Sequence, residues 1–320
     1  MTFLIGLRTR IRKIIMKNET WFVKGSRFIF ALVALLMLSI NFGYQKTLSH
    51  WWVSVVIAAI CMFIPAQGAS VVISFVGVIQ LMALSTDLGV AAIIIMILVY
   101  ALTSYFKSAY QFNNIAIAGL NQLRIPFCAP LAAGLLGNFN ELAGVVGGSI
   151  VAFYLKEVKE NAASFLDETS DITAADLIQT RMISNTMFYI FLAAMIIGFM
   201  VVYFVRTKEI KYAWVQGTGL GVVTQFVILL AGYLFVGNKS NIPTLIIGSV
   251  ISFAVGMLFV FFFKGLDYSR IEKVQYEDDD YFYYVTAVPK IHIAEQEKEI
   301  KKITDAKIPG VKDINDEDAE

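Results

Sequence analysis

The chain contains few residues of the kinds that metal proteins and soluble enzymes depend on. Only 16% of its residues are charged, and it has two histidines and two cysteines. His50 and His292 lie far apart, and no group of His and Cys has the spacing of metal ligands. Cys61 and Cys128 both fall in apolar runs, where cysteine serves as a small hydrophobic residue, so we predict neither a disulfide nor a redox pair. We therefore expect no metal and no cofactor.

Signatures of catalysis and of nucleotide binding are missing as well. The sequence has no Walker motif, so any ATPase would have to be a separate chain. No carboxylate pair, His–Glu site or Ser–His pair falls in the apolar runs, and we expect no enzymatic activity. The segment 217–221 superficially resembles a phosphate loop, but it lies in an apolar helical run and predicts close helix packing. The net charge of +1 gives no indication of a nucleic-acid partner.

Hydrophobic residues are what the chain has in excess. They make up 58% of it, against about 45 to 50% in an ordinary soluble domain. They gather in long runs, which predict an all-α polytopic membrane protein with about eight transmembrane helices. The predicted crossings are residues 28–42, 51–65, 69–84, 88–106, 142–155, 183–205, 213–236 and 242–263.

The middle of the chain does not have the pattern of ordinary crossings. Between residues 107 and 155, polar clusters, prolines and glycines interrupt apolar pieces of about a dozen residues. Two arms, residues 112–123 and 126–136, are each too short to cross a core of about 30 Å, so we predict a re-entrant hairpin at about 112–136. With both termini on one side of the membrane, the number of crossings must be even. A re-entrant hairpin does not cross the membrane, so it leaves the eight predicted crossings, which is an even number.

Charge and composition divide the chain into five segments. These are a basic leader (1–27), a first membrane unit containing the hairpin (28–155), a polar linker (156–182), a three-helix membrane unit (183–263) and a soluble cytoplasmic tail (264–320). The basic leader and the loop with Arg206, Lys208 and Lys211 place both termini in the cytoplasm of a cell-membrane protein. The leader is either an amphipathic helix on the inner leaflet or only a flank that orients the first crossing.

Two local signals concern helix ends and helix packing. Asp171 or Thr173 can cap a helix that runs from the linker into the membrane. Gly144, Gly148 and Ala152 recur at four-residue spacing, which predicts a close-packing seam on the crossing 142–155.

Arg124 is the charged residue that this pattern places inside the membrane, between the hairpin arms. By default, an arginine inside the membrane lines a substrate pathway or pairs with a partner group. The second arm, beginning at Pro126, would also direct the positive end of its helix dipole at an anion. We therefore predict a substrate-binding site, with the following candidate residues: Arg124, Asn121, Gln122, Gln216 and Gln225. The alternative is a shallow hairpin whose Arg124 extends to the inner surface as a topology anchor.

Carboxylates are predicted only at the edges of crossings, at Asp87 and Glu141, which argues weakly against a proton-driven pump.

In the tail, residues 271–276 and 281–291 flank an acidic turn and predict a β-hairpin, followed by a short helix at 295–303. Its tyrosines supply contact area with polar ends, and they are candidates for partner docking: Tyr276, Tyr281, Tyr283 and Tyr284.

Two passages give the chain a family resemblance. The passage from Leu123-Arg124-Ile125-Pro126 to Gly137 and the tail from Asp267-Tyr268-Ser269-Arg270 to Ala287-Val288-Pro289-Lys290 are similar to uncharacterised multi-pass membrane proteins of low-GC Gram-positive bacteria. Those proteins are loosely labelled transporter permeases, of the kind found with ABC transporters. The resemblance implies a fold and a membrane location, and it implies no substrate and no catalytic residues.

Two functional interpretations follow. In the first, the chain is a transport or permease component with an anion-compatible site at the re-entrant hairpin. In the second, it is a non-transporting scaffold or assembly subunit that docks a partner through its C-terminal tail. Beyond the lipid bilayer, both leave room for a separate ATPase or another membrane-complex subunit, and for a homo-oligomer. The interruptions between residues 107 and 155 favour the transport interpretation. The β-hairpin of the tail looks incomplete on its own, which favours the scaffold interpretation.

Overall fold

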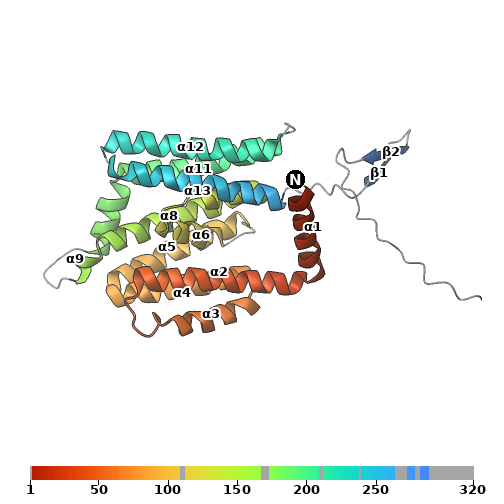
Figure 1. The fold of residues 1–320 in the computed structure, drawn as a ribbon. Coiled ribbons are helices and arrows are strands. Elements are labelled where there is room, and N and C mark those ends of the chain that lie inside the picture. Colours follow the sequence, from red (N-terminus) through yellow and green to blue (C-terminus); the bar gives the residue numbers. More distant parts are fainter. Residues whose placement is uncertain are drawn as a thin grey trace, which may run out of the picture. The chain divides into compact units, whose positions relative to one another are not determined.

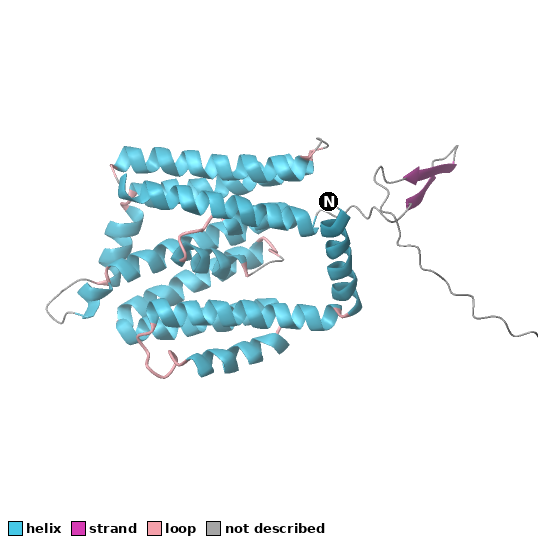
Figure 2. Cartoon of the chain, viewed as in Figure 1, coloured by secondary structure: helices cyan, strands magenta, loops and turns pink. Residues whose placement is uncertain are grey.

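A computed structural model describes residues 2–108, 112–166, 173–208, 212–237, 239–263, 272–277 and 282–287. Its contacts divide the chain into two units, one reaching Gly265 and the other beginning at Leu266. All regular structure described in the first unit is helical (Figures 1 and 2). In the second unit the described residues form two short strands.

Six helices are long and apolar enough to cross a membrane: α2 (Glu19–Phe42), α4 (Ala66–Leu84), α5 (Thr86–Tyr105), α11 (Thr186–Thr207), α12 (Ala213–Val236) and α13 (Ile242–Phe263). Their outer faces expose large hydrophobic side chains, such as Ile97 and Leu98 on α5 and Ile247 and Val250 on α13. Water-soluble proteins rarely expose continuous apolar surface on this scale. The fold therefore indicates a multi-pass membrane protein.

Two further helices and a broken helix pair complete the bundle. Helix α3 (Trp51–Phe63) is apolar but has only 13 residues, and α8 (Leu142–Glu160) is apolar up to a charged last turn. Helices α6 (Asn113–Gln122) and α7 (Cys128–Leu136) are short, with 10 and 9 residues. Short 3-10 turns, Phe139–Glu141 and Lys239–Asn241, lead into α8 and α13.

The helices form two groups, and α6 and α8 lie between them (Figure 1). Helices α2 to α5 make up one group, and α11 to α13 make up the other. Helix α8 packs against α5 of the first group and α11 of the second. In the broken pair, α6 contacts α2 and α8, whereas α7 contacts α11, α12 and α13. The pair α6–α7 therefore connects the two groups.

The N-terminal leader is shorter than the sequence suggested. Helix α1 (Thr2–Lys17) ends at a break at Asn18, and residues 19–27 already belong to α2. Glu19 lies in the first turn of α2, where its negative charge is favourable beside the helix N-terminus. The guanidinium of Arg8 lies 5.9 Å from the ring centroid of Phe261, so α1 contacts the end of α13.

The linker also differs from the prediction. Helix α8 continues past Leu155 to Glu160, and α9 (Ala162–Leu166) follows. Thr173 caps the short α10 (Ala174–Asp176) through a capping box, which confirms Thr173 as a cap, while Asp171 lies outside the described residues. Hydrogen bonds from Thr173 lower the pKa of Asp176 below its ordinary value.

The predicted continuous helix from the linker into the membrane is wrong. Residues Leu177–Ile183 form a π-helical segment that stops at Ser184. The side chain of Asn185 then accepts a hydrogen bond from the Met187 backbone N–H at 2.9 Å and starts α11 as a new helix. A side chain that satisfies a free backbone N–H competes with continuation of the preceding helix.

Glycines allow the closest helix contacts. A Cβ on Gly148 would lie 3.0 Å from the Asn113 carbonyl oxygen and from the Asn114 Cα, so α6 and α8 touch through backbone. This confirms the predicted seam on α8. Gly221 of α12 packs directly against Val202 of α11, which confirms that the segment 217–221 serves helix packing.

The described part of the second unit is a two-stranded antiparallel sheet. Strand β1 (Glu272–Glu277) pairs with β2 (Phe282–Ala287), and the register sets Tyr276 opposite Tyr283. The side chain of Tyr284 is 77% exposed. Tyr281, the acidic turn around it and the helix expected at 295–303 lie outside the described residues.

Candidate functional site

The tip of the α6–α7 pair is held between α8 and α13. The Asn121 side chain donates a hydrogen bond to the Ala152 carbonyl of α8 at 3.1 Å. On the other side, the Arg124 backbone lies so close to Gly248 of α13 that a Cβ there would be 2.7 Å from the Arg124 oxygen. Helices of 10 and 9 residues reach about 15 Å at 1.5 Å per residue, so each arm covers only part of a bilayer core.

Arg124 occupies an unusual backbone position at this tip. Its φ is +63°, in the left-handed region that favours glycine and disfavours residues with a Cβ. Its side chain is exposed and has no hydrogen-bond or ion-pair partner among the described residues. Arg124 is therefore not buried within the protein, and its position inside the membrane stays a prediction. The carboxylates of Glu141 and Glu157 are buried instead.

A second cation, which the sequence did not point to, lies at the same tip. The ammonium of Lys159, near the end of α8, donates to the Asn41 side-chain oxygen at 2.6 Å and to the Gln122 side-chain oxygen at 3.5 Å. Its neighbour Lys156 pairs with Glu157 at 3.5 Å instead. Lys159 has no carboxylate partner in the described part of the chain, so its positive charge is uncompensated there.

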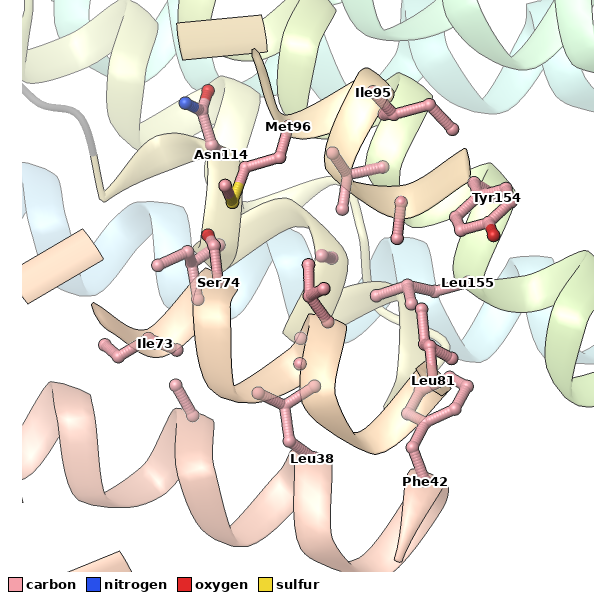
Figure 3. A pocket seen from close by; sticks show the side chains of 18 of the residues that line it. Leu38, Phe42, Ile73, Ser74, Leu81, Ile95, Met96, Asn114, Tyr154 and Leu155 are labelled. Atoms are coloured by element: carbon pink, nitrogen blue, oxygen red, sulfur yellow. The ribbon is translucent and has the colours of Figure 1, made fainter. Parts of the chain in front are cut away.

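Beside α6 lies a cavity of about 100 Å³, shown in Figure 3. Helices α2, α4, α5, α6 and α8 form its walls. One whole face of α6 lines it, from Asn114 through Ala118 to Gln122. Most of the remaining wall is apolar and includes Met37, Leu38, Phe42, Ile73, Gly77, Leu81, Ile95, Met96 and Leu155.

The two ends of this cavity carry amide atoms that have no hydrogen-bond partner in the described structure. Asn114 is only 4% exposed, and neither atom of its amide has a hydrogen-bond partner in the described structure. The buried side-chain nitrogen of Gln122 also has none. The hydroxyl of Tyr100, by contrast, contacts the hydroxyls of Ser70 and Ser74, each at 3.0 Å. Because an unpaired buried polar group costs about 1 to 3 kcal/mol, such groups usually serve a ligand or a water molecule.

Glu141 forms a buried polar centre next to one end of the cavity. It is 1% exposed, and its carboxylate accepts hydrogen bonds from the Ser108 hydroxyl at 2.8 Å and the Asn113 amide at 2.9 Å. A Cβ on Gly144 would lie 3.6 Å from both the Ser108 hydroxyl and the Asn114 oxygen, so the centre adjoins Asn114. The sequence placed Glu141 at a helix edge and gave no signal of its burial.

Arg206 holds the far end of α7. Its guanidinium, at the end of α11, donates to the carbonyls of Leu135 and Gly137, the second at 2.9 Å. Leu135 lies in the last turn of α7 and Gly137 is its C-cap, and carbonyls at a helix end have no partners within the helix. The guanidinium also lies over the rings of Tyr203 and Trp214. Arg206 therefore positions α7, in addition to contributing to the basic loop.

The structure brings only some of the predicted binding residues together. Asn121, Gln122 and Arg124 share the tip, and of the five only Gln122 lines the cavity. Gln225 is fully buried between α12 and α11, where it packs on Gly198, and both atoms of its amide lack partners within the described residues. Gln216 lies on an exposed face of α12.

No group of three or more His, Cys, Asp or Glu side chains in the described ranges could hold a metal ion. Comparisons with protein-family models, with curated proteins and with solved structures find no match to the chain. Function must therefore be argued from the geometry of the hairpin tip and the cavity.

Proposed function

We propose that the chain is a transport or permease component of a membrane, with an anion-compatible site at the tip of the α6–α7 hairpin. The observation that carries this proposal is a broken helix pair between two helix groups, with two cations, Arg124 and Lys159, at the break. Interrupted helices of this kind form the substrate sites of many transporters.

The chemistry of the tip suits an anion. Lys159 has no carboxylate partner in the described residues, and Arg124 has no partner there at all. An arginine held at a φ of +63°, where glycine is sterically favoured, is consistent with a requirement for its side chain. A guanidinium can bind a carboxylate or phosphate through two parallel hydrogen bonds.

The proposed topology has eight crossings: α2, α3, α4, α5, α8, α11, α12 and α13. In this topology α6 and α7 form a re-entrant hairpin, and both termini are cytoplasmic. The hairpin contacts both helix groups, so a movement of one group against the other would change access to its tip.

The role of the tip can be tested by charge substitution. Arg124→Gln is expected to lower the uptake of labelled small carboxylates or phosphate into proteoliposomes by at least about tenfold, because the bidentate contact is lost. Arg124→Lys should fall between Arg124→Gln and the unsubstituted protein, and Lys159→Gln should also reduce uptake. Lys208→Gln is the matched control, since Lys208 is an exposed cation just beyond the end of α11.

Normal uptake by folded Arg124→Gln protein, or no uptake of any tested anion by the unsubstituted protein, would contradict the transport function. Either result would favour the scaffold. That alternative has an observation of its own, because within the described residues the sheet has only two strands, and Tyr284 on one of them is exposed. Its partner would then be a separate ATPase or another membrane-complex subunit.

The topology has a separate test. After replacement of the buried Cys61 and Cys128 by alanine, we expect Lys46→Cys to react with a membrane-impermeant thiol reagent in intact cells. Asp316→Cys should react only after the cells are opened. Labelling of Asp316→Cys in intact cells would place the C-terminus outside and would overturn the even number of crossings.

A further inference from the structure

Helix α1 lies across one end of the helix bundle, where α2 begins and α13 stops (Figure 1). The chain turns at Asn18, between the end of α1 and the start of α2 at Glu19. From this turn α1 reaches the second helix group, because the Arg8 guanidinium lies over the Phe261 ring near the end of α13. Since α2 and α13 are long and apolar enough to cross a membrane, a helix that runs across their ends would lie along the membrane surface.

Aromatic side chains near α1 indicate the level of this membrane surface. Trp21 of α2 is 68% exposed, and Phe63 at the end of α3 is 71% exposed. The Lys24 ammonium lies 5.3 Å from the ring centroid of Trp21 and 5.7 Å from that of Phe63. Tryptophan is enriched where the hydrocarbon core meets the lipid headgroups, and a lysine beside it extends toward the water. Lys17, the last residue of α1, precedes Trp21 by four residues, so α1 would lie at the depth of the headgroups.

One face of α1 is apolar and is not covered by the bundle. Leu7, Ile11 and Ile14 follow one another at spacings of four and three residues, which places them on one side of the helix; we call this side the apolar face. The side chains of Leu7 and Ile14 are 43% and 64% exposed. A helix with such a face at headgroup depth buries it in the outer part of the acyl chains.

Cations flank the apolar face. The sequence of α1 contains no carboxylate and five positively charged residues: Arg8, Arg10, Arg12, Lys13 and Lys17. Arg10 precedes Ile14 by four residues and Lys17 follows it by three, so both exposed cations lie beside the apolar face. Long cationic side chains in this position reach the lipid phosphates. Clusters of about four to eight cations on an amphipathic helix are typical of binding to anionic lipids, so the complementary partner is a negatively charged bilayer surface.

We propose that α1 binds the surface of an anionic phospholipid leaflet, with its apolar face in the outer acyl region and Arg10, Lys13 and Lys17 at the lipid phosphates. A segment that only orients the first crossing needs positive charge but no exposed apolar face. This surface is separate from the hairpin tip, and the proposal does not depend on the transport function.

The depth of α1 can be measured on the full chain in nanodiscs that hold one copy. Cys61 and Cys128 are first replaced by alanine, and a nitrobenzoxadiazole fluorophore is attached to Ile14→Cys or Met16→Cys. Met16 is the matched control, because it is 75% exposed and lies about 200° around the helix axis from Ile14. In phosphatidylglycerol bilayers, a lipid with a nitroxide near its headgroup should quench the label at position 14 at least about threefold more strongly than the label at position 16.

The requirement for negative lipid charge is tested by changing the lipid. Replacing phosphatidylglycerol by phosphatidylcholine should lower the quenching at position 14 at least about twofold, because each cation near an anionic surface strengthens binding about fivefold.

The requirement for the cations is tested by substitution. A variant that combines Arg10→Gln, Lys13→Gln and Lys17→Gln should show, in phosphatidylglycerol, only the quenching that the unsubstituted helix shows in phosphatidylcholine. Glutamine has about the same helix propensity as lysine and arginine, so α1 should remain helical. The matched control removes three exposed cations outside α1 and should leave the quenching unchanged: Lys46→Gln, Lys107→Gln and Lys208→Gln.

Equal quenching at positions 14 and 16, or equal quenching at position 14 in the two lipids, would overturn the proposal. The same conclusion would follow if the variant of α1 without the three cations were quenched as strongly as the unsubstituted helix. Shielding of position 14 only in discs that hold two copies would assign the apolar face to a second copy of the chain and would also overturn the proposal. The expected quenching in a protein that takes up no anion would support lipid binding and contradict transport alone.

Discussion

Replacing Gly148 by valine is expected to lower the free energy of unfolding by about 3 kcal/mol, near the upper end of the usual effect of overpacking. A Cβ at this position already lies 3.0 Å from the Asn113 oxygen, the Asn114 Cα and the end of the Ile117 side chain. Two of these three atoms belong to backbone, which cannot rotate away as a side chain can. The two extra methyl groups of valine therefore push α6 away from α8.

The measurement is unfolding of the purified protein in mixed micelles of a mild detergent and dodecyl sulfate, followed by tryptophan fluorescence. Gly219→Val is the control, because it introduces the same β-branched residue into a helix where a Cβ meets only Phe253, at 4.0 Å. It should lose less than about 1 kcal/mol, as expected for a helix surface position. If both variants lose the same free energy of unfolding, α6 and α8 are packed less closely than in the structure.

Glu141→Ala should produce a loss of similar size, about 3 kcal/mol, through unpaired hydrogen-bond donors. The carboxylate accepts bonds from Ser108 and Asn113, and all three groups lie where α5, α6 and α8 come together. Alanine leaves the buried Ser108 hydroxyl and the partly buried Asn113 amide without this acceptor. Glu141→Gln keeps an oxygen that can accept one of these bonds, so we expect it to lose clearly less than Glu141→Ala.

The same unfolding measurement tests this order. Asp87→Ala is a suitable control, since Asp87 is a carboxylate in the first turn of α5 with an exposed side chain. Its loss should be small, because only a favourable interaction with the helix N-terminus disappears. If Glu141→Ala unfolds as the unsubstituted protein does, the carboxylate contributes nothing to the junction of α5, α6 and α8.

Helix boundaries could be predicted from the sequence because they depend on local signals. Residues 213–236 and 242–263 were predicted and observed with identical limits, since polar residues and turns flank uninterrupted apolar runs. The arms of the hairpin differ by only one or two residues from the observed α6 and α7. The extension of α2 back to Glu19 was missed, because charged residues at a membrane boundary look the same in a helix and in a loop.

The candidate site depended on contacts that no local pattern contains. Lys159 belongs to the charged end of α8, and only the packing of α6 on α8 brings it to Gln122. Glu141 is buried because Ser108 and Asn113, from elsewhere in the chain, close over it. The cavity requires five helices, and two glycines that line it, Gly77 and Gly119, are indistinguishable in sequence from glycines that pack.

The position of α7 constrains the order in which the protein can be assembled during synthesis. Helix α7 packs mainly on α11 and α13, which begin about fifty and about one hundred residues after its end. A nascent chain that has emerged only as far as α8 has no partner for that face of α7, and a helix of 9 residues cannot span the bilayer alone. We therefore expect α7 to reach its final position only after α11 and α13 have been synthesised. Insertion of the first half and closure of the bundle would then be separate events in biogenesis.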